Sequence, residues 1–464
     1  MPDQTRTPAL LYLTLSLSLL VFPARAQDWP KYEAEAVERL QEYLRLDTSN
    51  PPGNEKVGAE FFCKLFDAEG IECQIFEIAP GRANAYARLR GDGSKRPLIL
   101  LNHTDVVQAT AKTWSVPPFS GAIRDGAVYG RGAQDMKSEG MLQAMAMIVL
   151  KSERVPLARD VIFLAVADEE VGGIGTDWMV ANKKDLFADA EYLINEGGEN
   201  IVEDGTVPFW TVSVGEKIPY WLRLTARGRA GHGSRPRRDA APHRLARALA
   251  RVVDYETPLR VLPMVQKIFC DMARARYPQE REKFCNLETS LRDPSSRRRL
   301  TENPDWNYML RDTISLTVMK GGPQTNVIPA EAVAELDIRL LPGSDPEVMM
   351  GEIRRLVADD GIEIELMSPY RVPNSSSADK ELWRVFETVV VKHFPSTVVT
   401  PRLSSGYTES QVYRQLGIHA YGFSPFVMPP EEARTAHGTD ERIAVAAYKQ
   451  GLRVLYDVVT AIAK

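Results

Sequence analysis

The stretch PLILLNHTDVV, residues 97–107, joins an apolar run to a histidine and an aspartate that stand two positions apart. A short apolar run of this kind is typical of a strand that is buried on both faces of a sheet. His103 and Asp105 then stand where that strand ends. In an open α/β sheet, ligands bind beyond the carboxyl ends of the strands. The same few residues therefore predict both the fold class and a candidate site.

Two further apolar runs, VIFLAVA at 161–167 and YLIN at 192–195, are separated by helical patterns. Upstream, helical patterns at 32–46 and 55–68 lead to a strand that we expect at 72–78. Strands that alternate with helices indicate an α/β fold whose mainly parallel sheet is covered by helices.

The length of the chain, 464 residues, exceeds what one hydrophobic core usually serves and predicts more than one domain. From residue 214 the strands alternate between apolar and polar side chains, and an Arg-rich helix follows at 240–253. This pattern indicates an inserted α+β domain of antiparallel strands and helices at 214–330. We therefore expect the main domain to consist of two parts, 27–213 and 331–464, around the insertion.

The first 26 residues have the pattern of a signal peptide. An apolar stretch at 8–21, too short to span a bilayer, precedes the small residues Ala24 and Ala26. Cleavage before Gln27 would give an exported protein, periplasmic or secreted, without a stable membrane anchor; the alternative is a retained anchor. The 57 Lys and Arg residues against 62 Asp and Glu, without long basic blocks, argue against a nucleic-acid partner.

The four cysteines fall into two close pairs, Cys63 with Cys73 and Cys270 with Cys285. In an exported protein, these pairs predict two local disulfides, with free buried thiols as the alternative. None of the cysteines has the spacing of a metal ligand, which argues against a zinc site built from thiolates.

Ligand-type side chains gather where the predicted strands end. They are His103 and Asp105, Glu169 and Glu170 in ADEEVGG, Glu196 in NEGG, and Asp135 in the glycine-rich turn YGRGAQDMK. Carboxylates crowded into one crevice repel each other, and bound cations would relieve that repulsion. Histidine with several carboxylates and no cysteine suits a hydrolytic site with two metal ions. Singly, each signal is more often structural: a polar strand end, or a pair of glutamates in a solvated loop.

Adjacent glutamates at a strand end tend to point in opposite directions. One member of the pair at 169–170 can therefore bind metal while the other faces the attacking water as a general base.

Seven motifs together resemble the co-catalytic zinc metallopeptidase family twenty. They are NHTDVV, the W-x-x-P-P-F-S-G to D-M-K segment, DEEVGG, NEGG, AGHGSRP, GGPQTNVIPAEA and AHGTDERI. The family includes the aminoacylases, glutamate carboxypeptidase, carboxypeptidase S, acetylornithine deacetylase and succinyl-diaminopimelate desuccinylase. The resemblance covers nearly the whole chain after residue 26, with the motifs in family order.

This resemblance implies two Zn2+ per subunit, with Co2+ or Mn2+ as possible substitutes. Asp135 would bridge the two ions; His103 and Glu196 would complete the protein ligands of one, and Glu170 and His437 those of the other. The peptide bond between Asp135 and Met136 would be cis.

Two further side chains receive roles beside the metals. The resemblance implies that Glu169 is the general base and that Asp105 orients the ring of His103.

The resemblance also implies that 214–330 is a lid and dimerisation domain of a homodimer. His232 would reach the active site of the partner subunit and bind the oxyanion, while Asn326 and Arg339 would contact substrate. The alternatives are a loop histidine capped by glycines and an arginine on the surface. Gly406 lies in LSSGYTESQ, which departs from the family pattern because Glu409 replaces an aspartate, so substrate preference transfers least securely.

The function predicted in this way is that of an exported dinuclear zinc hydrolase, which cleaves an amide bond next to a free carboxylate. A carboxypeptidase or dipeptidase acting on small peptides is the first interpretation, and an N-acyl-amino-acid amidohydrolase, or aminoacylase, is the alternative. A non-catalytic binding protein on the same fold is a third hypothesis. Retention of Glu169 and of every ligand position argues against it.

Overall fold

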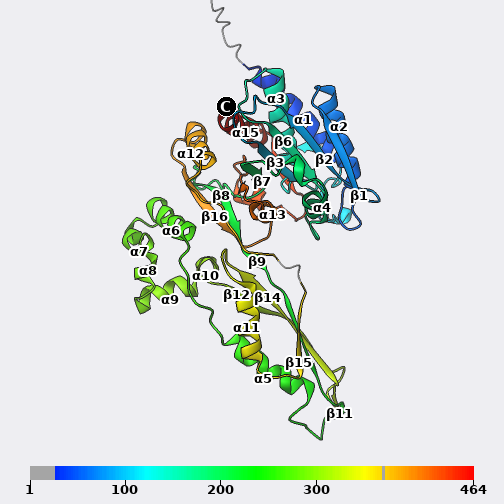
Figure 1. Cartoon of the computed structure of the whole chain (residues 1–464), viewed down its shortest axis with the longest axis vertical. Coiled ribbons are helices and arrows are strands. Elements are labelled where there is room, and N and C mark those ends of the chain that lie inside the picture. Colours follow the sequence, from blue (N-terminus) through cyan, green and yellow to red (C-terminus); the bar gives the residue numbers. More distant parts are fainter. Residues whose placement is uncertain (1–26, 368–370) are drawn as a thin grey trace, which may run out of the picture.

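The computed structural model describes residues 27–367 and 371–464 (Figure 1). The predicted signal peptide, residues 1–26, lies outside the described residues. Within them, no helix has both the length and the apolarity that crossing a membrane requires.

An eight-stranded sheet forms the core of the larger part of the molecule. Its order is β1 (Cys73–Ala79), β2 (Arg82–Leu89), β6 (Val161–Val166), β3 (Leu98–His103), β7 (Tyr192–Asn195), β17 (His419–Gly422), β8 (Phe209–Glu216) and β16 (Val398–Ser404). Strands β6, β3, β7 and β17 pair in parallel, as do β8 and β16. The prediction of a mainly parallel sheet is therefore confirmed.

Strand β2 was missed by the sequence reading. Its sequence, RANAYARL, has no apolar run, yet β2 pairs with β1 on one side and with β6 on the other, both antiparallel. Its strand conformation depends on these two neighbours rather than on its own propensity.

Helices cover both faces of this sheet. One face packs against α1 (Trp29–Leu44), α2 (Lys56–Ala68), α3 (Lys137–Ser152), α12 (Glu381–His393) and α15 (Val445–Ala463), and the other against α4 (Ile174–Asn182) and α13 (Ser410–Gln415). Within β3, Leu98 and Leu100 join the first core while Ile99 and Leu101 join the second. This alternation explains why the first four residues of the strand are all apolar.

A second, antiparallel sheet builds the smaller part of the molecule (Figure 1). Its order is β12 (Thr313–Lys320), β14 (Glu331–Leu340), β10 (Leu222–Arg227) and β15 (Ile362–Leu366), and β9 (Ile218–Pro219) also pairs with β14. Helices α5 (Ala241–Val253) and α11 (Pro346–Val357) share its core.

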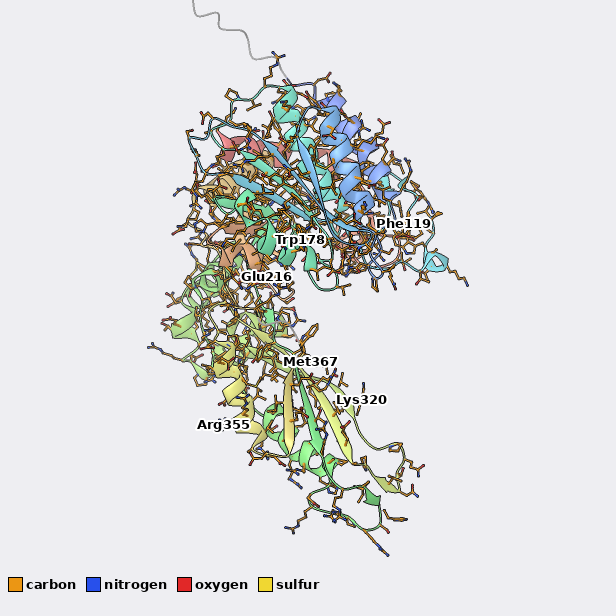
Figure 2. All side chains as sticks on the ribbon, turned by 45° about the vertical axis from the view of Figure 1, so that its right-hand side comes forward. Phe119, Trp178, Glu216, Lys320, Arg355 and Met367 are labelled. Atoms are coloured by element: carbon orange, nitrogen blue, oxygen red, sulfur yellow. A yellow bond between two sulfur atoms is a disulfide. The ribbon has the colours of Figure 1, made fainter. Side chains whose placement is uncertain are left out.

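This second sheet extends beyond residue 330, where we had placed the end of the insertion. Ala334 and Leu336 of β14, Ile353 of α11 and Ile362 of β15 are buried in the same core as Leu224 of β10. The sequence boundary therefore cuts between strands that pair with each other. It was misplaced because nothing local shows which of two sheets a strand joins. Figure 2 labels Glu216, at the end of β8, and Met367, just after β15, on either side of the junction.

A helical segment between β10 and β12 belongs to neither sheet. It comprises α6 (Pro263–Ala275), α7 (Arg281–Phe284), α8 (Leu287–Ser290), α9 (Pro294–Glu302) and α10 (Pro304–Leu310). Its core includes Phe269 and Phe284 together with Leu403 of β16, so part of the predicted insertion packs on the edge of the main sheet.

Two disulfides are present, Cys63–Cys73 and Cys270–Cys285. The local pairing is thus confirmed. The first links α2 to β1, and the second ties α6 to the residue after α7.

Short strands complete the structure. β4 (Ala122–Arg124), β5 (Ala127–Tyr129) and β18 (Arg442–Ala444) form a three-stranded sheet, and β11 (Gly231–His232) pairs with β13 (Val327–Ile328) at the far end of the second sheet (Figure 1).

Candidate functional site

The ligand-type residues meet at one edge of the main sheet. His103 ends β3, Glu169 and Glu170 follow β6, and Glu196 follows β7. Because these strands are parallel and adjacent, their carboxyl ends lie side by side. Asp135 precedes α3, and the loop after α14 (Pro430–Ala433) carries His437.

A cavity of about 400 Å3, called here the site cavity, opens at this edge. Its lining includes Asp135, Glu139, Glu169, Glu170, Glu196, Glu199, Arg402, Tyr407, Thr408 and His437.

The two oxygens of Asp135 face two different histidines. His103 Nε2 lies 3.0 Å from Asp135 Oδ1 and 3.7 Å from Glu196 Oε2. His437 Nε2 lies 2.9 Å from Asp135 Oδ2 and 3.3 Å from Glu170 Oε2. The arrangement consists of two sets of three donors that share one carboxylate.

The spacing of these donors fits a divalent metal ion. Atoms bound to one tetrahedral zinc through bonds of about 2.0–2.2 Å lie about 3.3–3.6 Å apart, and the four separations between histidine nitrogens and carboxylate oxygens, 2.9 to 3.7 Å, are close to this range. In addition, Glu170 Oε1 is buried and has no hydrogen-bond partner among the described residues. A buried carboxylate oxygen without a partner is costly, and a metal ion would satisfy it.

The charges of the site indicate a need for positive charge. Burial raises the pKa of Glu196, and the nearby carboxylate of Asp135 raises it further. Hydrogen bonds to Asp135 and Glu170 raise the pKa of His437 to about 10. Burial favours the neutral ring of His103, but its contacts with Asp105, Asp135 and Glu196 raise its pKa well above the usual value. Protonation of the His103 and His437 rings would balance part of the negative charge of the carboxylates, and a bound cation would balance the same charge.

Asp105 joins two of the three strand ends that carry the site, those of β3 and β6. Its Oδ1 accepts a hydrogen bond from the backbone N–H of Glu169 and its Oδ2 from that of Glu170, each at 3.1 Å. Asn50 also donates to Oδ2, at 2.9 Å. His103 Nδ1 lies 3.0 Å from the backbone oxygen of Asp105 and 3.5 Å from Oδ1. Because Nδ1 faces only acceptors, it carries a hydrogen, so Nε2 would be the atom that binds a metal ion.

A second network joins the loops of Asp135 and His437. Glu441 accepts hydrogen bonds from the backbone N–H of Gln134 at 2.7 Å and of Asp135 at 3.2 Å. It also pairs with Arg131, which donates to the backbone oxygens of His437 and Gly438. His437 itself has a φ of 57°, in the left-handed region that non-glycine residues rarely adopt. The peptide bond between Asp135 and Met136 is cis, as predicted.

Glu169 lines the site cavity beside the two donor sets. Its ligand atom lies within 4.8 Å of those of His103 and Glu196. Burial raises its pKa well above the usual value, and the charge of Glu196 adds to this effect.

Several residues of this site were missed by the sequence reading. Asn50 and Glu441 hold ligand-bearing loops, and Glu139 and Arg402 line the cavity. The only local signal was for Glu139, which stands in the first turn of α3, shortly after Asp135.

The structure does not bring the predicted lid residues to the site within one chain. His232 is exposed on β11, at the far end of the second sheet, where its Nδ1 contacts Ser234 (Figure 1). Asn326 lies beside it and accepts a hydrogen bond through its backbone oxygen from Gly233 at 2.7 Å.

Two further predicted substrate residues lie near the junction of the sheets. Arg339 pairs with Asp337 at 2.7 Å and is not among the residues lining the site cavity. Gly406 is exposed, and the two residues that follow it, Tyr407 and Thr408, line the cavity instead.

Comparison with known proteins gives a consistent result. A model of peptidase family M20/M25/M40 matches residues 99–461. The chain is 29% identical over 400 residues to human N-fatty-acyl-amino acid synthase/hydrolase PM20D1, covering 82% of this chain and 77% of that protein. It is 28% identical over 442 residues to human aminoacylase-1, covering 94% and 97%.

Solved structures share the fold. An M20 family metallo-carboxypeptidase from Sulfolobus solfataricus superposes with a TM-score of 0.68 at 21% identity, covering 92% of this chain and 98% of that one. Human carnosine dipeptidase 1 gives a TM-score of 0.62 at 15% identity, covering 94% and 98%.

Proposed function

Because the chain belongs to peptidase family M20/M25/M40 and is a hydrolase of amide bonds, we propose that it removes the acyl group from N-acyl amino acids. The observation that carries the hydrolytic part of the proposal is the pair of donor sets that share Asp135 in the site cavity. The names of the curated relatives support the substrate class, since both the synthase/hydrolase and aminoacylase-1 are named for N-acyl amino acids or for removal of the acyl group.

Peptide cleavage of the carboxypeptidase type is the second candidate. A carboxypeptidase S-like relative from Dictyostelium discoideum, 28% identical over 376 residues, favours it. Both kinds of substrate present an amide bond next to a free carboxylate, so the same donor sets would serve either reaction.

We propose that the site holds two zinc ions, for which Co2+ or Mn2+ could substitute. His103, Asp135 and Glu196 would hold one ion, and Asp135, Glu170 and His437 the other. Bound at this place, the metals would polarise the scissile carbonyl and favour ionisation of the attacking water. The donor spacing and the buried, unpartnered Glu170 Oε1 support this proposal.

Glu169 would move the proton in this reaction. It would accept a proton from the attacking water and donate it to the nitrogen of the leaving amine. Its position on the cavity wall, within 4.8 Å of the ligand atoms of His103 and Glu196, suits both transfers. Asp105 would keep Glu169 in place through the backbone hydrogen bond at 3.1 Å.

We further propose a homodimer in which His232 completes the site of the partner subunit and binds the oxyanion. The exposure of His232 at the end of the second sheet, away from its own site, is compatible with such a role. Asn326, beside it, would contact the substrate carbonyl, and Arg339 the carboxylate. Arg339 would have to leave Asp337 or share its charge with that residue.

Export is proposed as well. Two disulfides persist best in an oxidising compartment, so Cys63–Cys73 and Cys270–Cys285 support a periplasmic or secreted protein.

A release assay on the metal-loaded protein tests the proposed function. Dipeptides, N-acetyl amino acids and long-chain N-acyl amino acids are offered with and without a chelator. We expect chelator-sensitive release of the amino acid from the N-acyl substrates. Hydrolysis of dipeptides alone would move the assignment to the second candidate, and no turnover despite bound metal would refute both.

A further inference from the structure

A second cavity, of about 260 Å3, lies next to the site cavity, and no role has been assigned to it. It is enclosed by β8 and β16 on one side and by α6 and α10 on the other. We propose that this cavity, called here the acyl pocket, binds the aliphatic chain of an N-acyl amino acid while the amide bond lies in the site cavity. The inference rests on the proposed function and adds to it the size and chemistry of the acyl group.

The middle of the acyl pocket is apolar. Ile268 and Met272 of α6, Met309 of α10, Phe209 of β8 and Leu403 of β16 line it. Such a wall gains from contact with an alkyl chain and gives no compensation for burying a polar or charged group.

The floor of the acyl pocket continues into the site cavity. Thr211 and Thr400, which pair across β8 and β16, line the acyl pocket. Ser213 and Arg402, the pair two residues further along, line the site cavity. Residues two apart in a strand face the same side, so these pairs form one continuous face. The four residue-to-residue steps from Thr400 to Ser404 span about 13 Å, which is the scale of an extended acyl chain.

An ion pair stands where the two cavities meet. Glu199 and Arg402 line both cavities, and Arg402 Nη1 lies 2.7 Å from Glu199 Oε2. Their side chains are 48% and 36% exposed. An exposed pair of this kind contributes little to stability, so a substrate can displace it at little cost.

A second ion pair stands at the far end. Arg276 pairs with Glu203, and its guanidinium lies 5.2 Å from the centre of the Phe209 ring. The disulfide Cys270–Cys285 fixes α6, which forms the outer wall, to the segment after α7. Because the pocket volume is about 260 Å3, the benefit of a longer chain must end where the chain fills it.

The test is a chain-length series of one amino acid acylated with acetyl to hexadecanoyl groups, assayed on the metal-loaded protein. We expect kcat/KM to rise by about fourfold for each added methylene, equivalent to about 0.8 kcal/mol, and to stop rising once the pocket is full. In Met272→Trp, which fills the pocket, the ratio of kcat/KM for dodecanoyl to acetyl substrate falls at least tenfold.

Two further variants complete the design. Met319→Trp changes an exposed methionine of β12, outside both cavities, and keeps the wild-type ratio. Met272→Glu places a charge in the pocket without adding bulk to α6, and we expect it to lower the same ratio. It serves as the test if the tryptophan variant fails to fold.

The outcomes separate the two proposals. A series in which kcat/KM does not depend on chain length, or pocket variants that fold and keep the wild-type ratio, would overturn the acyl pocket while leaving amide hydrolysis in place. Absence of turnover for every acyl length would overturn the proposed function itself.

Discussion

The substitution Asp105→Asn tests how the site is held together. Asp105 uses both carboxylate oxygens: Oδ1 accepts from the backbone of Glu169, and Oδ2 accepts from the backbone of Glu170 and from the side chain of Asn50. Asparagine has almost the same shape but replaces one oxygen with an NH2 group. Whichever way it turns, at least one backbone N–H then faces a donor instead of an acceptor.

The expected effect follows from that lost bond. An unsatisfied buried donor costs about 1–3 kcal/mol, which corresponds to about a 5-fold to 150-fold change in an equilibrium constant. We expect the cost to appear in metal affinity, because the Asp105 carboxylate holds the backbone of Glu170 and lies 3.5 Å from His103 Nδ1. Groups that orient metal ligands typically affect affinity by 10-fold to 100-fold, which agrees with this range.

The assay is a competition between the metal-free protein and a chromogenic chelator, with circular dichroism to verify folding. The matched control is Asp92→Asn, which makes the same change from carboxylate to amide in an exposed loop away from the site, where the remaining oxygen can still accept from the backbone N–H of Ser94. If Asp105→Asn folds and binds metal within twofold of the wild type, or if the control loses as much, the reasoning is wrong.

Three further predictions concern pH, assembly and the second donor set. Burial raises the pKa of Glu409 from 4.5 to about 8. Between these two pKa values the folded state keeps a proton that the unfolded state loses, so the free energy of unfolding falls as the pH rises from 5 to 8. In Glu409→Gln, this fall, measured by urea unfolding, is smaller by up to about 4 kcal/mol. Mixing inactive His232→Ala and Glu169→Gln subunits should restore up to a quarter of the wild-type activity, because about half of the dimers are mixed and one of the two sites in each mixed dimer is intact. No recovery after verified subunit exchange would argue against a role of His232 in the partner's site. His437→Ala should bind one metal ion instead of two by elemental analysis, whereas retention of both would remove His437 from the ligands.

Much of the site could be predicted because its signals are local. A buried parallel strand is largely apolar, so the first polar side chains along it mark its carboxyl end, as Asn102 and His103 do at the end of β3. Adjacent parallel strands then place the residues that follow them side by side, which brings Glu170 and Glu196 to His103 without any knowledge of loop structure.

Other features depend on contacts that no local pattern records. Strand β2 forms through its pairing with β1 and β6, and β14 belongs to the second sheet through its pairing with β10 and β12. Asn50 and Glu441 act on the site from distant points in the chain, through hydrogen bonds that only folding creates. The acyl pocket likewise arises where α6 meets β16, between segments more than a hundred residues apart.

The most direct test of the account compares wild-type protein with Glu169→Gln, each loaded with zinc. Metal content is measured by elemental analysis, and release of the amino acid from an N-acyl substrate is measured on the same samples. The account predicts two metal ions in both proteins, with turnover in the wild type only, because Glu169 moves the proton and does not hold the metal. Turnover that persists in Glu169→Gln, or a wild-type protein that binds no metal, would contradict it.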